Sequence, residues 1–506
     1  MSRIPSTREL SSCVTPAWAV PVIYSSPFGG YTDRFHLACI GTVQKIDPVL
    51  YSANIGYSSV MAQTKTDRIF EALQNRILAG ELPQGTRLDS LRQACRHYGV
   101  SKNIVVTVYD RLVARGLITA RQGAGFFVAH RPSMAVEPEN LQEAIDTVSL
   151  LRAQLDRPHT VLAGDGRPPE NWLLNAVPAL TVSAGEGGYG TPHGLLALRE
   201  YIAAAQLAQG IEVAPSQIVT TFGANHALDL VIRRFVRVGD PVLVDDPGYY
   251  PLFAKLRLAG AKVIGVPRRP SGPDPDLLGS LAKEYGARLF FTQSLGQNPT
   301  GCSIALPIAH AILQVAERQE MLVVDDDPFL DLPGIEGTRL AHLDLFDRVI
   351  QVGSYSKTLS PSLRSGYIIA SPGIASNLAE LKMILTVSSS SYTERIIANL
   401  IRSRRYEKIK FTMARRLSEA RAEGMRRLSS LGLSLFAEPH GGLYGWLKLP
   451  DDLDDLEMAR EASAHGIFLA PGSLFQAGWQ AHPPGMRINW SRVNDSRFYS
   501  FLRRIL

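Results

Sequence analysis

The chain has 506 residues, which is more than one ordinary hydrophobic core holds and favours two or more domains. Its hydrophobic share of 45% is typical of a globular protein, and no apolar run approaches the roughly 20 residues that a membrane-spanning helix needs. The four cysteines show neither paired nor metal-ligand spacing, which argues against a disulfide scaffold and against a metal site. We therefore expect a cytoplasmic protein that does not enter a membrane.

The net charge of +6 is concentrated in one short segment. Residues 65–131 contain eleven Lys or Arg and five Asp or Glu, whereas the rest of the chain contains 42 of each kind. A basic surplus confined to a small segment is typical of a nucleic-acid-binding module attached to a near-neutral domain. Charge alone leaves open the alternative of a solvated basic face without a partner.

Residues 1–60 show no sustained periodicity, and we predict a poorly ordered extension there. Apolar residues then recur at helical spacing over 64–80, and "DSLRQACRHYG" and "VSKNIVVTVYDRLVARG" predict two further helices that meet at Gly99. The segment "LITARQGAGFFVA" predicts two short strands joined by a turn. Three helices followed by a hairpin indicate a winged helix-turn-helix domain over residues 61–130.

The stretch from "GTRLDSLRQACRHYG" to "ARQGAGFFV" resembles the GntR-type DNA-binding domain over nearly its full length. The resemblance implies that the third helix enters the major groove of double-stranded operator DNA and that the hairpin touches the adjacent backbone. Phosphate contacts are expected from Arg92 in the second helix and from Arg121 in the hairpin. The early, exposed part of the third helix presents base-edge and phosphate contacts from Ser101, Lys102, Asn103 and Thr107.

Residues 131–165 are mixed in composition and punctuated by prolines, so we predict a linker that is partly helical. Over residues 166–506, buried-strand patterns such as "PVLVDD" and "MLVVDD" alternate with helical patterns. That alternation predicts an α/β domain with a mainly parallel, doubly wound sheet. Ligands of such sheets bind outside the carboxyl ends of the strands.

The segment "RVIQVGSYSKTLSPSLR" places Lys357 directly after a buried strand. A lysine that holds an aldehyde cofactor as a Schiff base needs a partly dehydrated site and neighbours that anchor the rest of the cofactor. Ser354, Ser356 and Arg364 offer hydroxyls and a guanidinium that suit a phosphate group. We therefore interpret the lysine as the group that bonds the aldehyde carbon and the arginine as the one that neutralises the phosphate.

Four other segments carry polar groups at predicted strand ends. In "TTFGANHALDL" the first helical amides, at Ala224 and Asn225, can bind phosphate oxygens. In "DDPGYY" Tyr249 can stack on a pyridine ring, and in "GQNPTG" Asn298 can bond a phenolic oxygen. One of the three carboxylates in "VVDDDPF" can pair with a protonated ring nitrogen. Each segment alone has an ordinary structural explanation, whereas their joint occurrence in this order favours a cofactor site.

These segments together resemble those of fold-type I aminotransferases, which use pyridoxal 5'-phosphate. The resemblance assigns the Schiff-base role to Lys357 and the phosphate-binding role to Arg364. It matches Asn298 to the asparagine of the N-P-x-G turn and Tyr249 to the ring-stacking tyrosine. Among the three acids, Asp326 matches the partner of the pyridinium nitrogen, and its two neighbours, Asp325 and Asp327, remain alternatives by a slip of one residue.

Two further residues enter through the resemblance alone. Arg487 in "GMRINWS" matches the arginine that grips the substrate carboxylate, and Tyr189 in "GGYGTPHG" matches a tyrosine brought toward the site. At Phe329 the chain departs from its relatives, which usually carry a tyrosine whose hydroxyl bonds the phenolic oxygen of the cofactor. The loss of that hydroxyl argues for binding of an amino compound over its turnover.

A GntR-type module followed by an aminotransferase-type domain is the arrangement of the MocR subfamily of bacterial transcriptional regulators, which the chain resembles over most of its length. The resemblance implies a homodimer, an operator with two half-sites, and a small amino-compound effector that displaces Lys357 and forms an external aldimine. The main alternative is an active aminotransferase that transfers an amino group from an amino acid to a 2-oxo acid. A DNA-binding protein that has lost the cofactor is disfavoured, because both Lys357 and Arg364 are present.

Overall fold

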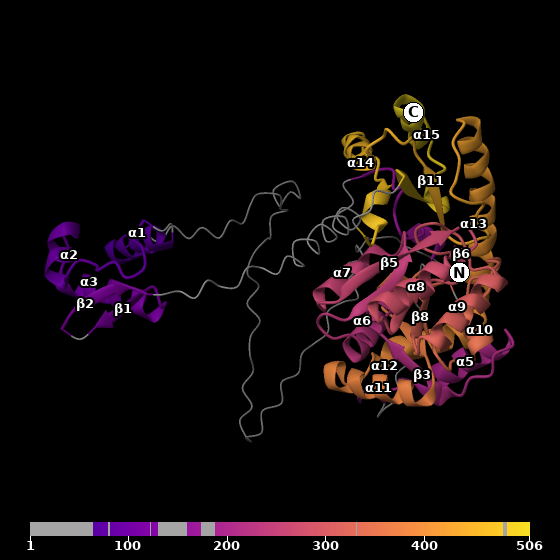
Figure 1. The fold of residues 1–506 in the computed structure, drawn as a ribbon, viewed down its shortest axis with the longest axis horizontal. Coiled ribbons are helices and arrows are strands. Elements are labelled where there is room, and N and C mark those ends of the chain that lie inside the picture. The colour runs from indigo at the N-terminus through magenta and orange to yellow at the C-terminus, as the bar shows by residue number, and fades with distance from the viewer. Residues whose placement is uncertain are drawn as a thin grey trace, which may run out of the picture. The chain divides into compact units, whose positions relative to one another are not determined.

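The computed structural model divides the chain into two compact units, Met1–Arg131 and Pro132–Leu506 (Figure 1). The predicted extension over residues 1–60 and most of the predicted linker lie outside the residues that the structure describes. Residues 159–165, at the end of the predicted linker, are described and lie within the larger unit. The structure describes residues 64–78, 81–121, 123–129, 159–173, 188–329, 331–478 and 483–506.

The smaller unit contains three helices and a hairpin, as predicted. The hydroxyl of Ser90 accepts a hydrogen bond from the amide of Gln93 and completes a capping box at the start of α2, and Gly99 ends that helix in the left-handed conformation. Buried side chains from all three helices, among them Phe70, Ala94 and Val108, form one core. The elements are α1 (Lys65–Leu78), α2 (Leu91–Tyr98), α3 (Lys102–Ala114), β1 (Ile118–Arg121) and β2 (Gly125–Val128).

The larger unit is built on an eight-stranded sheet with the order β3-β10-β9-β8-β7-β4-β5-β6. The pairs that join β5, β4, β7, β8 and β9 are parallel, whereas β10 runs antiparallel to both of its neighbours and β6 runs antiparallel to β5. The sheet is therefore mixed and mostly parallel, as predicted. Its strands are β3 (Ile218–Thr221), β4 (Pro241–Asp246), β5 (Lys262–Arg269), β6 (Gly272–Pro273), β7 (Leu289–Thr292), β8 (Leu322–Asp327), β9 (Val349–Ser354) and β10 (Gly366–Ile369).

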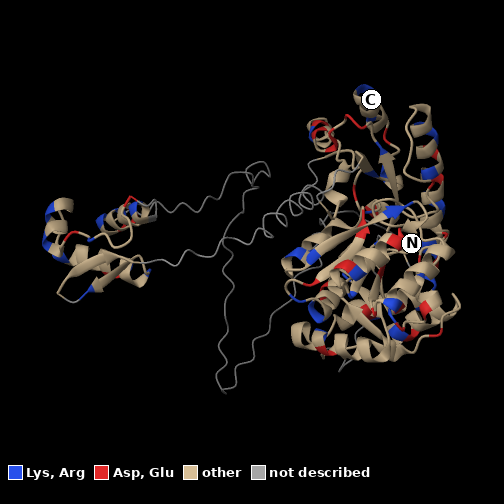
Figure 2. Cartoon of the chain, in the orientation of Figure 1, with Lys and Arg blue, Asp and Glu red and all other residues tan. Residues whose placement is uncertain are grey.

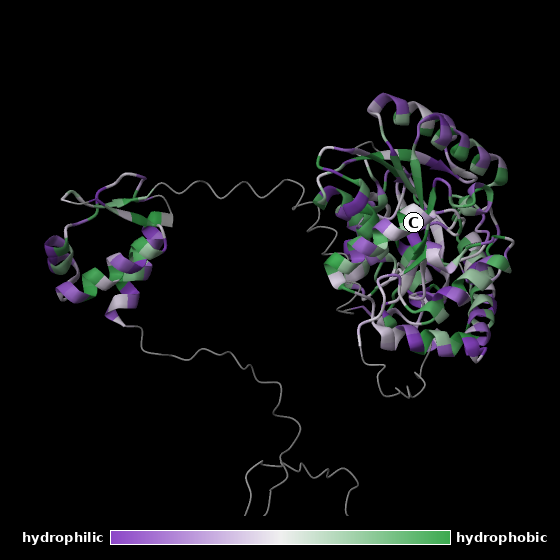
Figure 3. Cartoon of the chain, turned by 90° about the horizontal axis from the view of Figure 1, so that it is seen from below, coloured by the Kyte–Doolittle hydropathy of each residue, from purple (hydrophilic) through white to green (hydrophobic). Residues whose placement is uncertain are grey.

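Both faces of this sheet are covered by helices. Successive residues of β7 belong to different clusters, because Phe290 packs in one hydrophobic core and Phe291 in the other. Helices α5, α8, α9, α10 and α12 contribute to the first core, and α6, α7 and α11 contribute to the second. Figure 3 shows helices with mixed polar and apolar sides, as expected for amphipathic helices packed on a core. These helices are α5 (Leu196–Leu207), α6 (Ala224–Phe235), α7 (Tyr250–Leu258), α8 (Pro275–Tyr285), α9 (Leu306–Arg318), α10 (Leu340–Asp344), α11 (Pro372–Thr386) and α12 (Ser391–Arg402).

The C-terminal part of the larger unit is a three-stranded sheet with the order β11-β13-β12 and its own core. The segment that begins at residue 159 joins this part, because Val161 forms a bridge with Ile467 and is buried beside it. No helix among the described residues is both long and apolar enough to cross a membrane. The elements are α13 (Arg405–Ser430), β11 (Tyr444–Lys448), α14 (Asp455–Ala464), β12 (Ala470–Pro471), β13 (Gly485–Asn489) and α15 (Ser496–Ile505).

Candidate cofactor site and nucleic-acid interface

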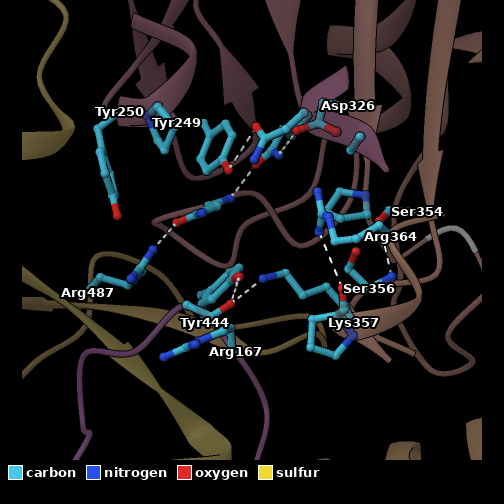
Figure 4. Close-up of a pocket in the computed structure, with 18 of the residues that line it drawn as sticks. Arg167, Tyr249, Tyr250, Asp326, Ser354, Ser356, Lys357, Arg364, Tyr444 and Arg487 are labelled. Carbon is cyan, nitrogen blue, oxygen red and sulfur yellow. Dashed lines mark hydrogen bonds between the residues drawn. The ribbon is translucent and has the colours of Figure 1, made fainter. Parts of the chain in front are cut away.

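A cavity of about 550 Å³ lies at the carboxyl ends of the central strands (Figure 4). It receives residues from the ends of β4, β7, β8 and β9, from the start of α6, and from the C-terminal β11 and β13. The predicted residues that line it together are Ala224, Asn225, Tyr249, Asn298, Asp326, Ser354, Ser356, Lys357, Arg364 and Arg487.

Lys357 follows β9 and points into the cavity, where its Nζ donates a hydrogen bond of 2.5 Å to the carbonyl oxygen of Gly166. Burial lowers the pKa of Lys357 to about 8, and the charges of Arg487 and Arg167 act in the same direction. A lysine with this pKa holds a sizeable fraction of neutral, nucleophilic amine near neutral pH.

One end of the cavity is suited to a phosphate group. The amides of Ala224 and Asn225 stand in the first turn of α6, where helix geometry leaves them without an intrahelical acceptor. Gly223 precedes them with a φ of 89°, and a Cβ atom there would lie 3.1 Å from the Arg364 guanidinium. Arg364 donates to the carbonyl of Phe222 at 3.2 Å, which holds its guanidinium beside these amides. Ser354 and Ser356 line the same cavity.

The three consecutive aspartates at the end of β8 have different environments. Asp325 accepts from the amide and the hydroxyl of Ser294, and Asp327 pairs with Arg339 at 2.8 Å. Asp326 alone of the three lines the cavity. Gln293 donates to its Oδ2 at 2.9 Å, whereas its Oδ1 is buried and has no hydrogen-bond partner among the described residues. Burial raises the pKa of Asp326 to about 7, and a bound cation would relieve that cost.

Arg487 and Asn298 form a direct contact within the cavity. Arg487 is 1% exposed, and its Nη1 donates to the Oδ1 of Asn298 at 2.9 Å while its Nη2 donates to the carbonyl of Gly164 at 2.7 Å. Its Nε is buried without a partner among the described residues, so the guanidinium keeps at least this N–H donor unused. Tyr249 also lines the cavity, and its hydroxyl makes a long 3.5 Å contact with the Oδ1 of Asn225.

Tyr189 lies apart from the other predicted site residues. It is 88% exposed and lines a separate hollow with residues such as Leu195 and Glu394. Within one chain the structure therefore does not bring Tyr189 into the cavity of Lys357.

The cavity also holds residues that sequence reasoning missed, among them Gly166, Arg167, Gln293 and Tyr444. Gln293 directly follows the buried strand β7, and its position at a strand end was a signal that could have identified it. Tyr444 lies in β11, opposite Asn489 of β13, and no local pattern marks it as a site residue.

All six residues predicted to contact DNA are exposed on the smaller unit. Ser101 precedes α3 and its hydroxyl makes no capping bond, whereas the hydroxyl of Thr107 donates to the carbonyl of Asn103 within the helix. The Arg121 guanidinium lies 4.6 Å from the ring centroid of Phe127 on the neighbouring strand. Figure 2 shows Lys and Arg positions, in blue, on the helices and the hairpin of this unit.

Comparison with known proteins identifies both modules. Residues 160–505 match the family "Aminotransferase class I and II", and residues 65–128 match "Bacterial regulatory proteins, gntR family". The crystal structure of the α-aminoadipate aminotransferase LysN from Thermus thermophilus, complexed with N-(5'-phosphopyridoxyl)-L-leucine, is 25% identical, with a TM-score of 0.63. The match covers 70% of this chain and 93% of that one.

Two relatives named as regulators match a large part of the chain. The uncharacterized HTH-type transcriptional regulator YdcR of Escherichia coli is 28% identical over 85% of this chain and 93% of its own length. The probable rhizopine catabolism regulatory protein MocR of Rhizobium meliloti is 32% identical, and the match covers 61% of this chain and 66% of that protein.

The fold and the comparisons together define a helix-turn-helix regulator of the GntR/MocR type with an aminotransferase-like domain. The chain belongs to the aminotransferase class I and II family through its larger unit, and that family binds pyridoxal 5'-phosphate. Its GntR module implies operator DNA as a partner.

Proposed function

We propose that the protein is a pyridoxal 5'-phosphate-dependent regulator that senses a small amino compound at Lys357. One observation carries the proposal: a lysine whose pKa is lowered to about 8 shares a cavity with the free amides of a helix start and with a carboxylate oxygen that has no hydrogen-bond partner among the described residues. These three features match the aldehyde, the phosphate and the ring nitrogen of the cofactor. The same chain carries a GntR-type DNA-binding module.

Each group of cavity residues is assigned to one part of the cofactor. When bound, pyridoxal 5'-phosphate supplies an aldehyde that condenses reversibly with primary amines. Ala224, Asn225 and Arg364 would hold the phosphate, and Ser354 and Ser356 would add hydroxyl donors. Asp326 would pair with the ring nitrogen, and Tyr249 would lie against the ring. The amide of Asn298 donates to the phenolic oxygen while its Oδ1 holds Arg487.

The effector is an amine that also carries an anionic group. Lys357 would supply the amine that holds the aldehyde, an effector amine would take its place, and the Arg487 guanidinium would bind the carboxylate or sulfonate of the effector. An effector can shift the DNA-binding equilibrium only through different affinities for the two conformations. Exchange of the lysine for a free amine gives the cavity two states that can differ in this way.

The protein acts as a homodimer on an operator with two half-sites, one for each winged helix. Ser101, Lys102, Asn103 and Thr107 meet the major groove, and Arg92 and Arg121 meet phosphates. Tyr189 is exposed and lies outside the cavity of its own chain, and in the dimer we assign it to the cavity of the partner.

An active aminotransferase is the second candidate, because every group expected to hold the cofactor is present in the cavity. Phe329 weighs against efficient turnover, since its buried ring has no hydroxyl to offer the phenolic oxygen.

Operator binding tests the proposal. Fluorescence anisotropy at one fixed salt concentration compares the duplex upstream of the protein's own gene with a scrambled duplex of equal length. We expect a preference of about a thousandfold or more for the upstream duplex. Equal, salt-sensitive binding to both duplexes, together with measurable transfer of amino groups to a 2-oxo acid, would favour the enzyme.

A further inference from the structure

The carbonyl oxygen of Gly166 accepts hydrogen bonds from two side chains. Lys357 donates its Nζ at 2.5 Å and Tyr444 donates its hydroxyl at 2.9 Å (Figure 4). Tyr444 comes from β11, far along the chain from Lys357. No pattern in the sequence indicates that the two side chains meet at one carbonyl oxygen.

Both partners of this contact are fixed in place. Tyr444 is 1% exposed, its ring meets the ring of Phe329 edge-on at 5.8 Å, and the Arg487 guanidinium lies 5.2 Å from its centroid. A Cβ atom on Gly166 would lie 3.3 Å from Arg487 Nη2, so the backbone there packs closely on the guanidinium. Asn489 holds the adjoining carbonyl of Asp165 at 2.7 Å. The hydroxyl of Tyr444 therefore has little freedom to leave the Gly166 oxygen.

This arrangement matters when Lys357 leaves the carbonyl. A buried carbonyl that loses its only donor carries the cost of an unsatisfied acceptor. Because Tyr444 stays, the Gly166 oxygen keeps a partner when the lysine amine moves to an aldehyde. The oxygen accepts both donors through its two lone pairs, but each donation draws electron density from the oxygen and weakens the other bond. The charge-assisted bond of the ammonium is the stronger and therefore loses more. Both effects favour the free, neutral amine over the bound ammonium.

We infer that Tyr444 is a positioning residue that keeps the amine of Lys357 available for condensation by occupying the carbonyl oxygen of Gly166. The inference rests on the proposed use of Lys357 to hold an aldehyde cofactor. Tyr444 also brings a phenol into the cavity, and its ring contacts that of Phe329, which has no hydroxyl.

The other charged groups around Lys357 act on it from several elements. Burial is the largest influence and lowers its pKa, Arg487 of β13 and Arg167 also lower it, and Asp165 and Asp326 raise it. These groups are unchanged when the hydroxyl of Tyr444 is removed. A change in the titration midpoint of Lys357 in the Tyr444→Phe variant is therefore due to the loss of the hydroxyl.

The test measures the titration of Lys357 in the full-length, cofactor-free protein. Reductive methylation with formaldehyde and sodium cyanoborohydride across a pH series is read by mass spectrometry of the Lys357 peptide. It gives the pH at which the amine becomes reactive, and exposed Lys283 controls for the reagents. We expect Tyr444→Phe to raise that midpoint by about half a unit or more, which is about a threefold loss of neutral amine below the midpoint. Tyr499→Phe is the matched control, because its hydroxyl is also buried but lies outside this cavity.

A second variant separates the hydroxyl from the packing. Tyr444→Met fills the space without a hydroxyl and should shift the midpoint in the same direction, while the thermal midpoint of each variant checks its fold. The rate at which pyridoxal 5'-phosphate is captured at pH 7 should fall about threefold in both variants, in step with the loss of neutral amine. A Lys357 midpoint that stays unchanged or falls in both folded variants would overturn the inference. Failure of the wild type to capture the cofactor would instead contradict the proposed function, because the methylation result does not depend on it.

Discussion

The guanidinium of Arg487 donates a 2.9 Å hydrogen bond to the side-chain oxygen of Asn298, and the two residues are 189 positions apart in the chain. Sequence reasoning gave them separate tasks, one on an effector carboxylate and one on the phenolic oxygen of the cofactor. Their contact means that the two ligands would bind to adjoining parts of one hydrogen-bonded group. We therefore expect an anion bound to Arg487 to change the environment of the bound cofactor through Asn298.

Arg487 should select amines that carry an acid group. Aminooxyacetate and O-methylhydroxylamine both react with aldehydes, but only the first has a carboxylate. In the cofactor-loaded protein we expect Arg487→Gln to slow the reaction of aminooxyacetate about tenfold or more, since a charge-assisted hydrogen bond is lost. The reaction of O-methylhydroxylamine should change little. Stopped-flow absorbance measures both rates, and equal slowing of the two reagents would remove the assigned role of Arg487.

Capture of pyridoxal 5'-phosphate should depend on pH through the amine of Lys357. Burial lowers the pKa of this lysine from 10.5 to about 8, and only its neutral form attacks an aldehyde. The rate should therefore rise about tenfold per pH unit below 8 and level off above it. Stopped-flow mixing of the cofactor-free protein with the cofactor from pH 6 to pH 10 measures this profile. A rate that continues to rise to pH 10 would indicate an ordinary, solvated lysine.

Asp326 should lower the stability of the cofactor-free protein and raise its affinity for the cofactor. Its Oδ1 is buried without a partner among the described residues, and burial raises its pKa to about 7. Asp326→Asn keeps an acceptor for Gln293 and removes the buried charge, so the cofactor-free protein should melt at an equal or higher temperature. Affinity for pyridoxal 5'-phosphate should fall about tenfold or more, because the partner of the ring nitrogen is lost. Calorimetry and absorbance titration test the two effects, and unchanged affinity would exclude Asp326 as that partner.

Much of the site could be predicted because its signals are local. Lys357, Asn298 and Tyr249 each follow a buried strand, and the topology of a mostly parallel sheet brings such positions to one edge. The choice of which aspartate faces the cofactor is harder. Side chains alternate along β8, so Asp326 points to the opposite face from Asp325 and Asp327, but the sequence does not show which face holds the ligand.

Other parts of the site depend on long-range pairing that no local pattern reveals. Tyr444 reaches the cavity because β11 pairs with β13, and Gly166 reaches it because Val161 pairs with Ile467. The helix-turn-helix module is the opposite case. Its helices, cap and hairpin are all encoded within neighbouring residues, and its fold was predicted in full.

DNA contacts at the start of α3 should separate into two kinds. Asn103→Ala should weaken binding to the preferred duplex and relax its sequence preference, at a cost of about 1–3 kcal/mol, if Asn103 meets a base edge. Lys102→Ala should weaken binding to all duplexes alike and reduce the salt dependence by about one phosphate contact. Arg115→Ala is a control at the other end of α3, where the guanidinium donates to Gln74, and it should leave DNA binding nearly unchanged. Anisotropy titrations at several salt concentrations distinguish these outcomes.

The central claim is that exchange of the amine at Lys357 changes DNA binding. Operator affinity is measured by anisotropy for the wild type and Lys357→Ala, each incubated with pyridoxal 5'-phosphate, with and without aminooxyacetate. For the wild type we predict a change of about fivefold or more in either direction, corresponding to about 1 kcal/mol of coupling. Lys357→Ala should bind the operator but show no such change. An operator affinity of the loaded wild type that is the same with and without aminooxyacetate would contradict the claim.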